Sequence, residues 1–123
     1  MPDIDFALQL RNIVERVSGA VSASLVGMDG IALAGFSEDN TYDVALADAE
    51  FAELLAGMRK ASHGMGVGNL AEMVITAEGS TLVARMIGTE FYIFITLKGE
   101  EKNLGLARIE LRRLANEFAE FLL

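Results

Sequence analysis

The final third of the chain most restricts what the protein can fold into. An apolar run at residues 91–97 is followed by a short charged segment at 98–102. The run reads as a strand, and its large side chains fall on both faces, with Phe91, Ile93 and Ile95 on one and Tyr92 and Phe94 on the other. A strand that is apolar on both faces must be buried on both. The sequence therefore predicts a sheet with a covering layer on each side.

The segment after this strand has the pattern of a helix that can supply one such layer. Its apolar residues recur at steps of three and four: Leu104, Ala107, Leu111, Leu114, Phe118 and Leu122. This spacing places them in one stripe, and the charged residues between them fall on the opposite face. We expect this helix to pack on the sheet through that stripe.

The preceding segments supply the remaining layers and strands. A first helix follows Asp3 or Asp5, either of which can cap it, and carries the stripe Phe6, Leu10, Ile13, Val14 and Val17. Strands are expected at 21–27, 31–36, 72–77, 81–87 and 90–97, and a long second helix from Thr41 or Asp43 to about Ser62. The first two strands are joined by a tight turn containing Asp29-Gly30.

The order α-β-β-α-β-β-β-α, with tight turns inside each strand group, predicts an α/β (α+β) fold built on a five-stranded antiparallel sheet. The second helix would cover one face of the sheet, and the first and third helices the other. We expect one domain over residues 1–123, since no linker, repeat or low-complexity tract interrupts the chain.

Composition and charge exclude several classes of function. The formal net charge is −8 and the ten lysines and arginines are scattered along the sequence, so we expect no nucleic-acid partner. No apolar run approaches the ~20 residues of a membrane span, so we expect no membrane insertion. The chain has no cysteine and one histidine, which argues against a structural metal site and favours a cytoplasmic location.

No segment predicts catalysis or cofactor binding. Gly64, Gly66 and Gly68 follow a helix and precede a strand, whereas a phosphate loop leads from a strand into a helix N-terminus. His63 is the only histidine, and a Ser–His–Asp site would also need a serine on a strained turn. The Gly-x-Ser-x-Gly motif that forms such a turn is absent from the sequence. We therefore expect a non-enzymatic protein without a cofactor and without a small-molecule substrate.

The second helix divides into three faces when residues are placed 100° apart. The expected core face holds Val44, Phe51, Leu54, Leu55, Met58 and Ala61, and the expected solvent face holds Glu50, Glu53, Gly57 and Lys60. A third stripe contains Ala45, Ala49, Ala52 and Ala56 and continues to Arg59 and His63. Four alanines in line permit close approach of another helix, but alanine is also simply a good helix former. Both interpretations stay open.

The second strand is a candidate for pairing with another copy. As an edge strand, residues 31–36 contain no lysine, proline or inward charge to block strand addition. Two copies could join antiparallel through this edge, placing their second helices side by side across the dyad. We therefore expect a homodimer whose interface comprises Ile31, Ala32, Leu33, Ala34, Ala45, Ala49, Ala52 and Ala56.

Residues 38–53 carry six acids and no base: Glu38, Asp39, Asp43, Asp48, Glu50 and Glu53. They are either a solvated helix start, favoured by the helix dipole, or a docking face for a basic partner. Asp48, Arg59 and His63 are the candidate residues for docking a partner protein.

Taken as a set in this order, the segments resemble the Roadblock, or dynein light chain, domain family. They are the hairpin VSASLVGMDGIALAGF, the long second helix, the meander GVGNLAEMVITAEGSTLVARMIGTEFYIFITL and the helix NLGLARIELRRLA. The resemblance is greatest to bacterial and archaeal MglB-like members. It implies a profilin-like sandwich with the first strand beside the fifth and the second strand at an edge.

The resemblance also implies a function. MglB-like members form homodimers that bind a small Ras-like GTPase and alter its nucleotide cycle without an arginine finger. Other members are adaptor or scaffold subunits that do not affect hydrolysis. A small-molecule sensor is a third alternative, which would need a pocket with converging polar groups.

Overall fold

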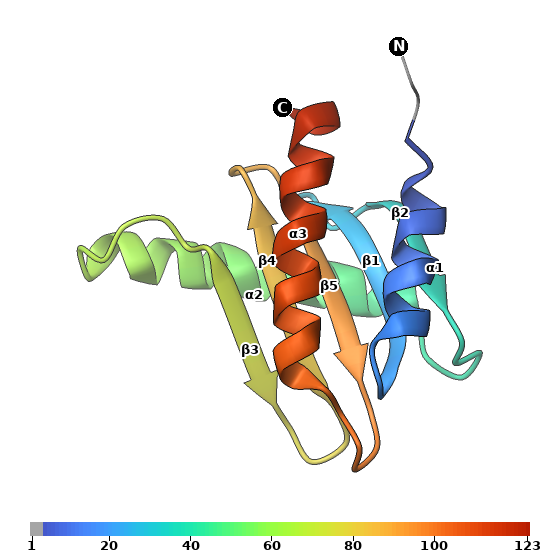
Figure 1. Ribbon diagram of the computed structural model, residues 1–123. Coiled ribbons are helices and arrows are strands. Elements are labelled where there is room, and N and C mark those ends of the chain that lie inside the picture. The colour runs from blue at the N-terminus through green and yellow to red at the C-terminus, as the bar shows by residue number, and fades with distance from the viewer. Residues whose placement is uncertain (1–3) are drawn as a thin grey trace.

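The computed structural model describes residues 4–123 and has the predicted order of elements (Figure 1). The helices are α1 (Phe6–Arg16), α2 (Val44–Gly64) and α3 (Leu104–Leu122). The strands are β1 (Ala20–Gly27), β2 (Ala32–Ser37), β3 (Glu72–Thr76), β4 (Thr81–Ile87) and β5 (Phe91–Leu97). Element boundaries differ from the expected ones by one or two residues. Ile31, for example, lies before β2, because its N–H is bonded to the Asp29 side chain within the turn.

Each helix begins at a side-chain cap that the sequence contains. Asp5, Asp43 and Asn103 each accept a hydrogen bond of 3.0 Å from the backbone N–H three residues further on. Such a bond satisfies one of the four N–H groups that the first turn of a helix leaves without a partner. Asp5 is therefore the cap of α1, and the alternative cap, Asp3, lies outside the described residues.

The five strands form one antiparallel sheet in the order β2-β1-β5-β4-β3. This confirms the expected placement of β1 beside β5 and of β2 at an edge; β3 forms the other edge. The β1–β2 register shifts between Leu25 and Val26, close to the turn that joins the two strands.

Two separate cores form, one on each face of the sheet. Ile93, Ile95 and Leu97 of β5 face α1 and α3, and Phe6 and Phe118 from those helices meet edge to face at 4.8 Å. On the other face, Tyr92 and Phe94 pack under α2. There the rings of Phe51 and Phe94 stack at 4.9 Å with an angle of 6° between them. The alternation along β5 thus decides which helix each side chain meets.

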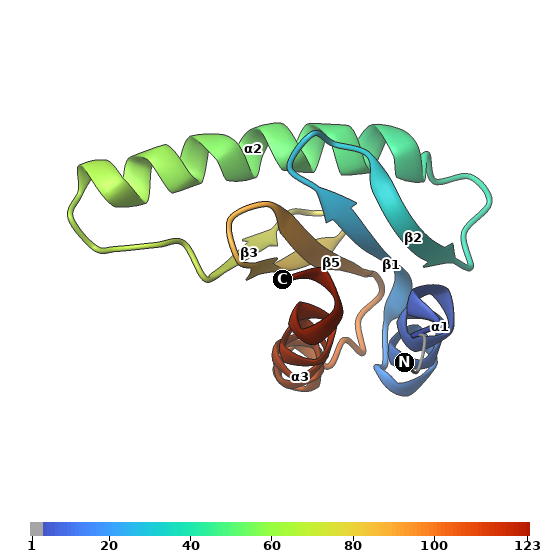
Figure 2. The same cartoon turned by 90° about the horizontal axis from the view of Figure 1, so that it is seen from above.

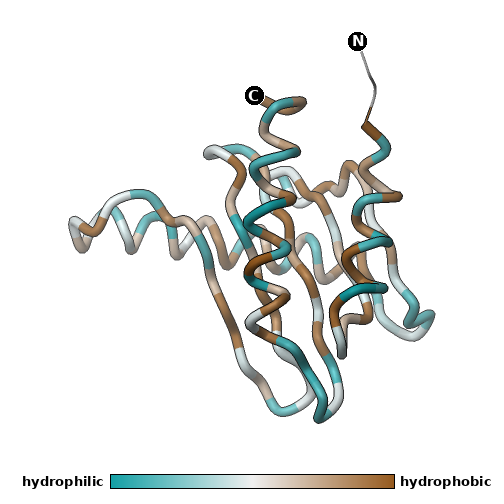
Figure 3. The backbone as a smooth tube through the Cα atoms, in the orientation of Figure 1, coloured by the Kyte–Doolittle hydropathy of each residue, from teal (hydrophilic) through white to brown (hydrophobic). Residues whose placement is uncertain are grey.

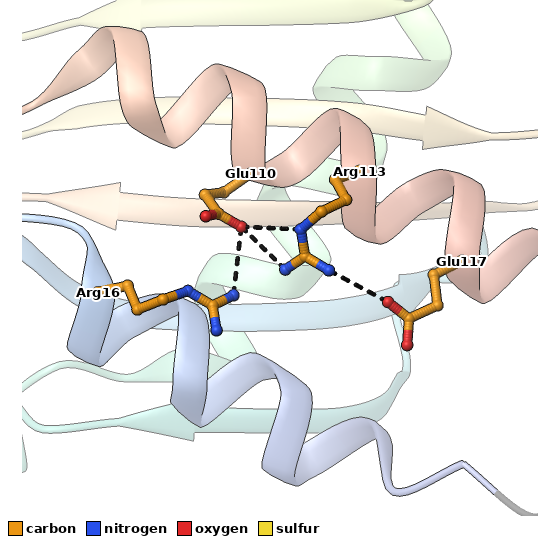
Figure 4. Close-up of polar contacts among 4 residues, drawn as sticks. All are labelled: Arg16, Glu110, Arg113 and Glu117. Carbon is orange, nitrogen blue, oxygen red and sulfur yellow. Dashed lines mark hydrogen bonds and ion pairs between the residues drawn. The ribbon is translucent and has the colours of Figure 1, made fainter.

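Hydropathy follows this layering, with apolar colour concentrated on the central strands and alternating along the helices (Figure 3). Ion pairs at the surface join the two helices on the same face. Glu110 of α3 binds Arg16 of α1 at 3.2 Å and Arg113 at 2.8 Å, and Arg113 also reaches Glu117 at 3.2 Å (Figure 4). Exposed pairs of this kind contribute about 0–1 kcal/mol each, so they orient α1 against α3 more than they stabilise the fold.

The long helix α2 crosses the other face of the sheet and continues past the β3 edge (Figures 1 and 2). Its N-terminal half lies over the sheet. Of residues 56–64, which form its C-terminal part, only Ser62 is buried and Arg59 half-buried; the others are exposed. This overhanging end is the least covered regular element of the described structure.

Candidate interaction surface

The buried face of α2 is rotated from the one the sequence predicts. Its buried residues are Asp48, Phe51, Ala52, Leu55 and Ser62. Leu54 and Met58, expected in the core, are 43% and 37% exposed, and Ala61 is also exposed. The prediction was wrong because it ranked faces by side-chain hydrophobicity alone, whereas the sheet binds α2 through a face that includes an acid and a serine.

The exposed face of α2 carries a ridge of apolar and acidic side chains. Leu46, Glu50, Leu54 and Met58 recur every four residues and therefore lie in one row. Leu46 is 56% exposed, and Glu50 is exposed in the middle of the row. We call these four residues the α2 ridge.

Two hollows flank the α2 ridge. One, of about 340 Å³, lies between α2 and the sheet and is lined by Tyr42, Ala47, Glu50, Phe51, Leu54, Ile75, Leu82 and Phe94. The other, of about 470 Å³, lies on the helix surface and is lined by Glu50, Glu53, Leu54, Gly57 and Met58. Apolar walls with carboxylates at the rim suit a protein surface that presents apolar side chains beside lysine or arginine.

The structure divides the six acids of residues 38–53. Asp39 binds Lys98 at 2.9 Å, and its pKa is lowered to about 2, chiefly by the hydrogen bond from the Thr41 hydroxyl and then by that from Lys98. Asp43 caps α2, and Asp48 is buried. Only Glu38, Glu50 and Glu53 are left exposed without such a role.

Asp48, a predicted docking residue, lies underneath α2 with 2% of its surface exposed and is not accessible to a partner. Its Oδ1 atom has no hydrogen-bond partner within the described residues. Burial raises the pKa of its carboxyl to about 6, against the opposing effect of a hydrogen bond from Ser24. The Tyr92 hydroxyl donates to the Asp48 carbonyl oxygen at 2.6 Å, and burial raises the pKa of that phenol. Asp48 is therefore part of the packing interface between α2 and the sheet.

The other two predicted docking residues lie near the overhanging end of α2. Arg59 is half-buried and donates from Nη1 to the Thr89 carbonyl at 2.9 Å, which ties α2 to the β4–β5 turn. His63 is exposed one residue before the end of the helix. Of the three, His63 is the one that a partner could reach without displacing an internal contact.

The alanine stripe of α2 is partly used inside the subunit. Ala52 is only 3% exposed and belongs to the core under α2, so it cannot contribute to a surface between copies. Ala49 lies against the β1–β2 turn: a Cβ atom at Gly30 would come within 3.2 Å of the Ala49 Cα atom. Ala45 and Ala56 are exposed. The small side chains at 49 and 52 therefore serve the approach of the turn to the helix.

The predicted strand edge is open. Ile31 and Leu33 are 67% and 47% exposed, Ala32 is exposed, and Ala34 is half-buried against the core beneath α1. The outer edge of β2 has no neighbouring strand in the sheet. A third hollow, of about 460 Å³, lies beside it, between the β1–β2 turn and residues 89–91.

Within residues 4–123, no helix is both long and apolar enough to cross a membrane. In the same range, no three acids, histidines or cysteines gather as metal ligands would. Gly66 and Gly68 have positive φ angles in the connection after α2, where no helix N-terminus follows. Their conformation closes the end of α2, as expected for glycines that terminate a helix.

Sequence comparison assigns no family: no protein-family profile matches the chain, and no curated protein matches it either. Comparison of structures gives full-length matches. The Roadblock/LC7 domain from Streptomyces avermitilis matches with a TM-score of 0.85 at 20% identity, covering 97% of this chain and 98% of the other. MglB from Myxococcus xanthus matches with a TM-score of 0.83 at 14% identity, with the same coverage. MglC from Myxococcus xanthus matches with a TM-score of 0.66 at 28% identity, covering 95% and 98%. The chain thus has the fold of the Roadblock/LC7 and MglB proteins, which confirms the resemblance at the level of structure.

Proposed function

We propose that this protein is a non-enzymatic homodimer that binds a small Ras-like GTPase in the cytoplasm and modulates its nucleotide cycle. The proposal is supported by the likeness of the fold to MglB over nearly the whole chain, together with what the MglB-like resemblance implies. It is also consistent with the sequence, which offers no catalytic constellation.

The α2 ridge is the observation that carries the proposal. A helix in an isolated domain normally turns its leucines inward, yet Leu46, Leu54 and Met58 are exposed. Leu54 and Met58 also line hollows beside the helix. Large apolar residues exposed together with a rim of acids are typical of a protein-binding surface. We assign the ridge to partner contact, with Glu50 and Glu53 pairing with basic residues of the GTPase.

The mechanism would be positional. A protein that supplies no catalytic side chain can still change the rate of hydrolysis or release by holding mobile loops of the GTPase in one arrangement. Such an effect requires different affinities for the GTP-bound and GDP-bound states. A domain that binds both states equally would instead be an adaptor, the alternative that the resemblance also allows.

The homodimer can form through either edge of the sheet. The sequence points to β2, with its exposed Leu33. The geometry of α2 supports β3, because the helix overhangs that edge and would meet its counterpart across a dyad there (Figure 2). At β3, Val74 is 39% exposed. Pairing at either edge would continue the antiparallel sheet from one copy into the next.

A capture experiment with matched variants tests the GTPase proposal. The immobilised protein is incubated with lysate of its source organism containing either GDP or a non-hydrolysable GTP analogue, and the retained proteins are identified. We expect a small GTPase to be retained in one nucleotide state. It should be lost with Leu54→Ser and kept with Glu120→Gln, a change at an exposed residue of α3.

The retained GTPase is then purified and its hydrolysis and nucleotide release are measured with and without this protein. A changed rate supports a regulator. Retention in both nucleotide states with unchanged rates would contradict it and support an adaptor. Retention of no GTPase in either state would contradict both the partner and the mechanism.

A further inference from the structure

The described structure leaves two arginines without partners, and the charges of both act on the same acid, Glu72. Five of the seven arginines have a side-chain hydrogen bond or ion pair: Arg11, Arg16, Arg59, Arg108 and Arg113. Within residues 4–123, Arg85 and Arg112 have none. Both lie around a single acid, Glu72, on the face of the sheet opposite to the α2 ridge.

Three elements bring these groups together. Arg85 of β4 is directly opposite Glu72 of β3 in the strand register, so the two side chains share a face of the sheet. Val83 and Ile87, two residues to either side of Arg85, lie in the core beneath α1 and α3, which fixes that face as the α3 side. From α3, Arg108 binds Glu72 in a bidentate pair, at 3.0 and 2.8 Å.

The electrostatics show that the three cations act on the same point. The pKa of the Glu72 carboxyl is lowered, chiefly by the hydrogen bond from Arg108, and also by the charges of Arg85 and Arg112. The charges of three arginines therefore act on one carboxylate, in a protein whose net charge is −8. The positive charge around Glu72 is therefore opposite in sign to the net charge of the protein.

Two of these arginines, Arg108 and Arg112, line a hollow on the surface of α3. It has a volume of about 300 Å³ and is lined by Gly105, Arg108, Ile109 and Arg112 on the outer side of α3. Ile109 is 67% exposed, and Gly105 leaves the hollow open where an alanine would suit the helix better. Arg113, by contrast, is held by Glu110 and Glu117 on the side of α3 that faces α1 (Figure 4).

We propose that Arg85, Arg108, Arg112 and Ile109 form a docking site for a short acidic segment of a second protein, one that carries carboxylates beside an apolar side chain. The free guanidinium groups of Arg85 and Arg112 bind the carboxylates, and the apolar side chain fills the hollow against Ile109. Guanidinium groups suit this task because they bind carboxylates in a bidentate geometry. The long polyanionic backbone of a nucleic acid would instead be repelled by the rest of the molecule.

The site lies on the opposite face of the sheet from the α2 ridge, so the domain could hold two proteins at once. It does not depend on the identity of the partner at the ridge. A protein that binds a GTPase on one face and an acidic segment on the other would bring the GTPase to the complex that contains the acidic segment.

Fluorescence anisotropy with a defined peptide tests the site. The probe is a labelled ten-residue peptide of aspartate and glutamate with one central leucine, and the control probe has lysine at every acidic position. We expect the acidic probe to bind and the lysine probe not to bind. Binding should weaken as salt is added, because surface ion pairs are screened. Amide shifts in an NMR titration should be confined to β3, β4 and the first half of α3.

Matched variants distinguish direct contact from a structural role. Arg112→Gln and Ile109→Ser change exposed side chains and should each weaken binding about threefold to fivefold, the range of an exposed contact. Glu72→Gln should strengthen binding, because it removes the competing carboxylate and frees Arg108. Arg11→Gln, an exposed arginine of α1, should bind as the unmodified protein does.

Three outcomes would overturn the proposal. They are equal binding by Arg112→Gln and Arg11→Gln, weaker binding by Glu72→Gln, and failure of the acidic probe to bind at low salt. A fourth is binding to vesicles of phosphatidylserine in phosphatidylcholine that Arg112→Gln abolishes while the acidic peptide does not bind, because the site would then recognise a lipid surface.

Discussion

At the scale of single residues, Asp48 has the environment least suited to its chemistry. Its carboxyl is buried under α2, one oxygen has no partner within the described residues, and its pKa is raised to about 6. A folded-state pKa above the ordinary value of 3.8 means that ionisation opposes folding. With respect to this group, the free energy of unfolding should therefore be greatest below about pH 4, should fall as the pH rises from about 4 to about 6, and should be level above that.

Asp48→Asn should remove this dependence, because the amide has the same shape and does not ionise. We expect the variant to be more stable than the unmodified protein at pH 8 by about 1–3 kcal/mol, and to lose the advantage towards pH 4. Urea unfolding followed by circular dichroism from pH 4 to pH 8 measures both curves. Glu53→Gln, at an exposed position, is the control. Parallel curves for Asp48→Asn and the unmodified protein would contradict the assignment.

Two alanines of the same stripe should respond differently to the same substitution. Ala52→Arg places a charge in the core under α2 and should lower the free energy of unfolding by about 3 kcal/mol or more. Ala56→Arg is at an exposed position and should leave the fold intact, so it alone reports on helix pairing between copies. Thermal unfolding and mass in solution, measured on both variants, separate the two effects. Equal stability of the two would contradict the burial of Ala52.

The sequence could predict which side chains of the strands are buried, but not which side of α2 is. Side chains alternate between the two faces of a strand, and residues 91–97 are apolar on both faces, so the sequence predicts burial on both. For α2, apolar residues occur over a wide arc. The buried face depends on contacts with distant strands that no local pattern encodes, among them the stacking of Phe51 on Phe94 and the hydrogen bond from the Tyr92 hydroxyl to the Asp48 carbonyl. Leu54 and Met58 were therefore assigned to the wrong side.

At the scale of elements, α2 combines a stable helix with an open surface. Gly57 lies in its interior, and beyond its two chain neighbours and the local helix backbone no atom lies within 4 Å of where a Cβ would be. Gly57→Ala should therefore stabilise the protein by roughly 0.5–1 kcal/mol, the difference in helix propensity. The added methyl group also narrows the hollow beside Leu54 and Met58, so binding of the partner at the ridge should weaken.

Chemical unfolding and partner affinity, measured on the same Gly57→Ala preparation, test both halves of this expectation. Gly79→Ala is the control, since Gly79 lies in a turn and also has open space around it. Higher stability with unchanged affinity would show that the partner does not use this hollow. Lower stability would mean that α2 is constrained at Gly57 by something other than its own propensity.

The order of the elements and the pairing of consecutive strands were predictable from sequence because local signals agree with one another, whereas the placement of β1 beside β5 came from the family resemblance. Caps, turn glycines and periodicity each mark the same boundaries, and short turns between strands leave an antiparallel sheet as the natural result. The overhang of α2 was not predictable. Periodicity gives the length of a helix, but where it lies on a sheet depends on packing between side chains that are far apart in the sequence.

At the scale of the whole molecule, the uncovered end of α2 and the two open edges of the sheet indicate that a single copy leaves apolar surface unsatisfied. If the protein is a homodimer, folding and association are coupled, and the unfolding midpoint should rise with protein concentration. Sedimentation at micromolar concentration should give the mass of two chains. A mass of one chain, or a midpoint that does not change with concentration, would contradict the homodimer.

Matched lysines at the two edges should identify the one that pairs. Leu33→Lys places a lysine on the β2 edge, and Val74→Lys places one on the β3 edge. The Leu33 and Val74 side chains are 47% and 39% exposed, so neither change should unfold the subunit. A lysine on an edge strand opposes addition of another strand. The overhang of α2 at β3 leads us to expect that Val74→Lys yields a monomer, whereas Leu33→Lys stays dimeric. The reverse result would place the interface at β2, where the sequence first suggested it. A dimer that withstands both changes would have to associate through helices alone, with both edges of the sheet left free for other chains.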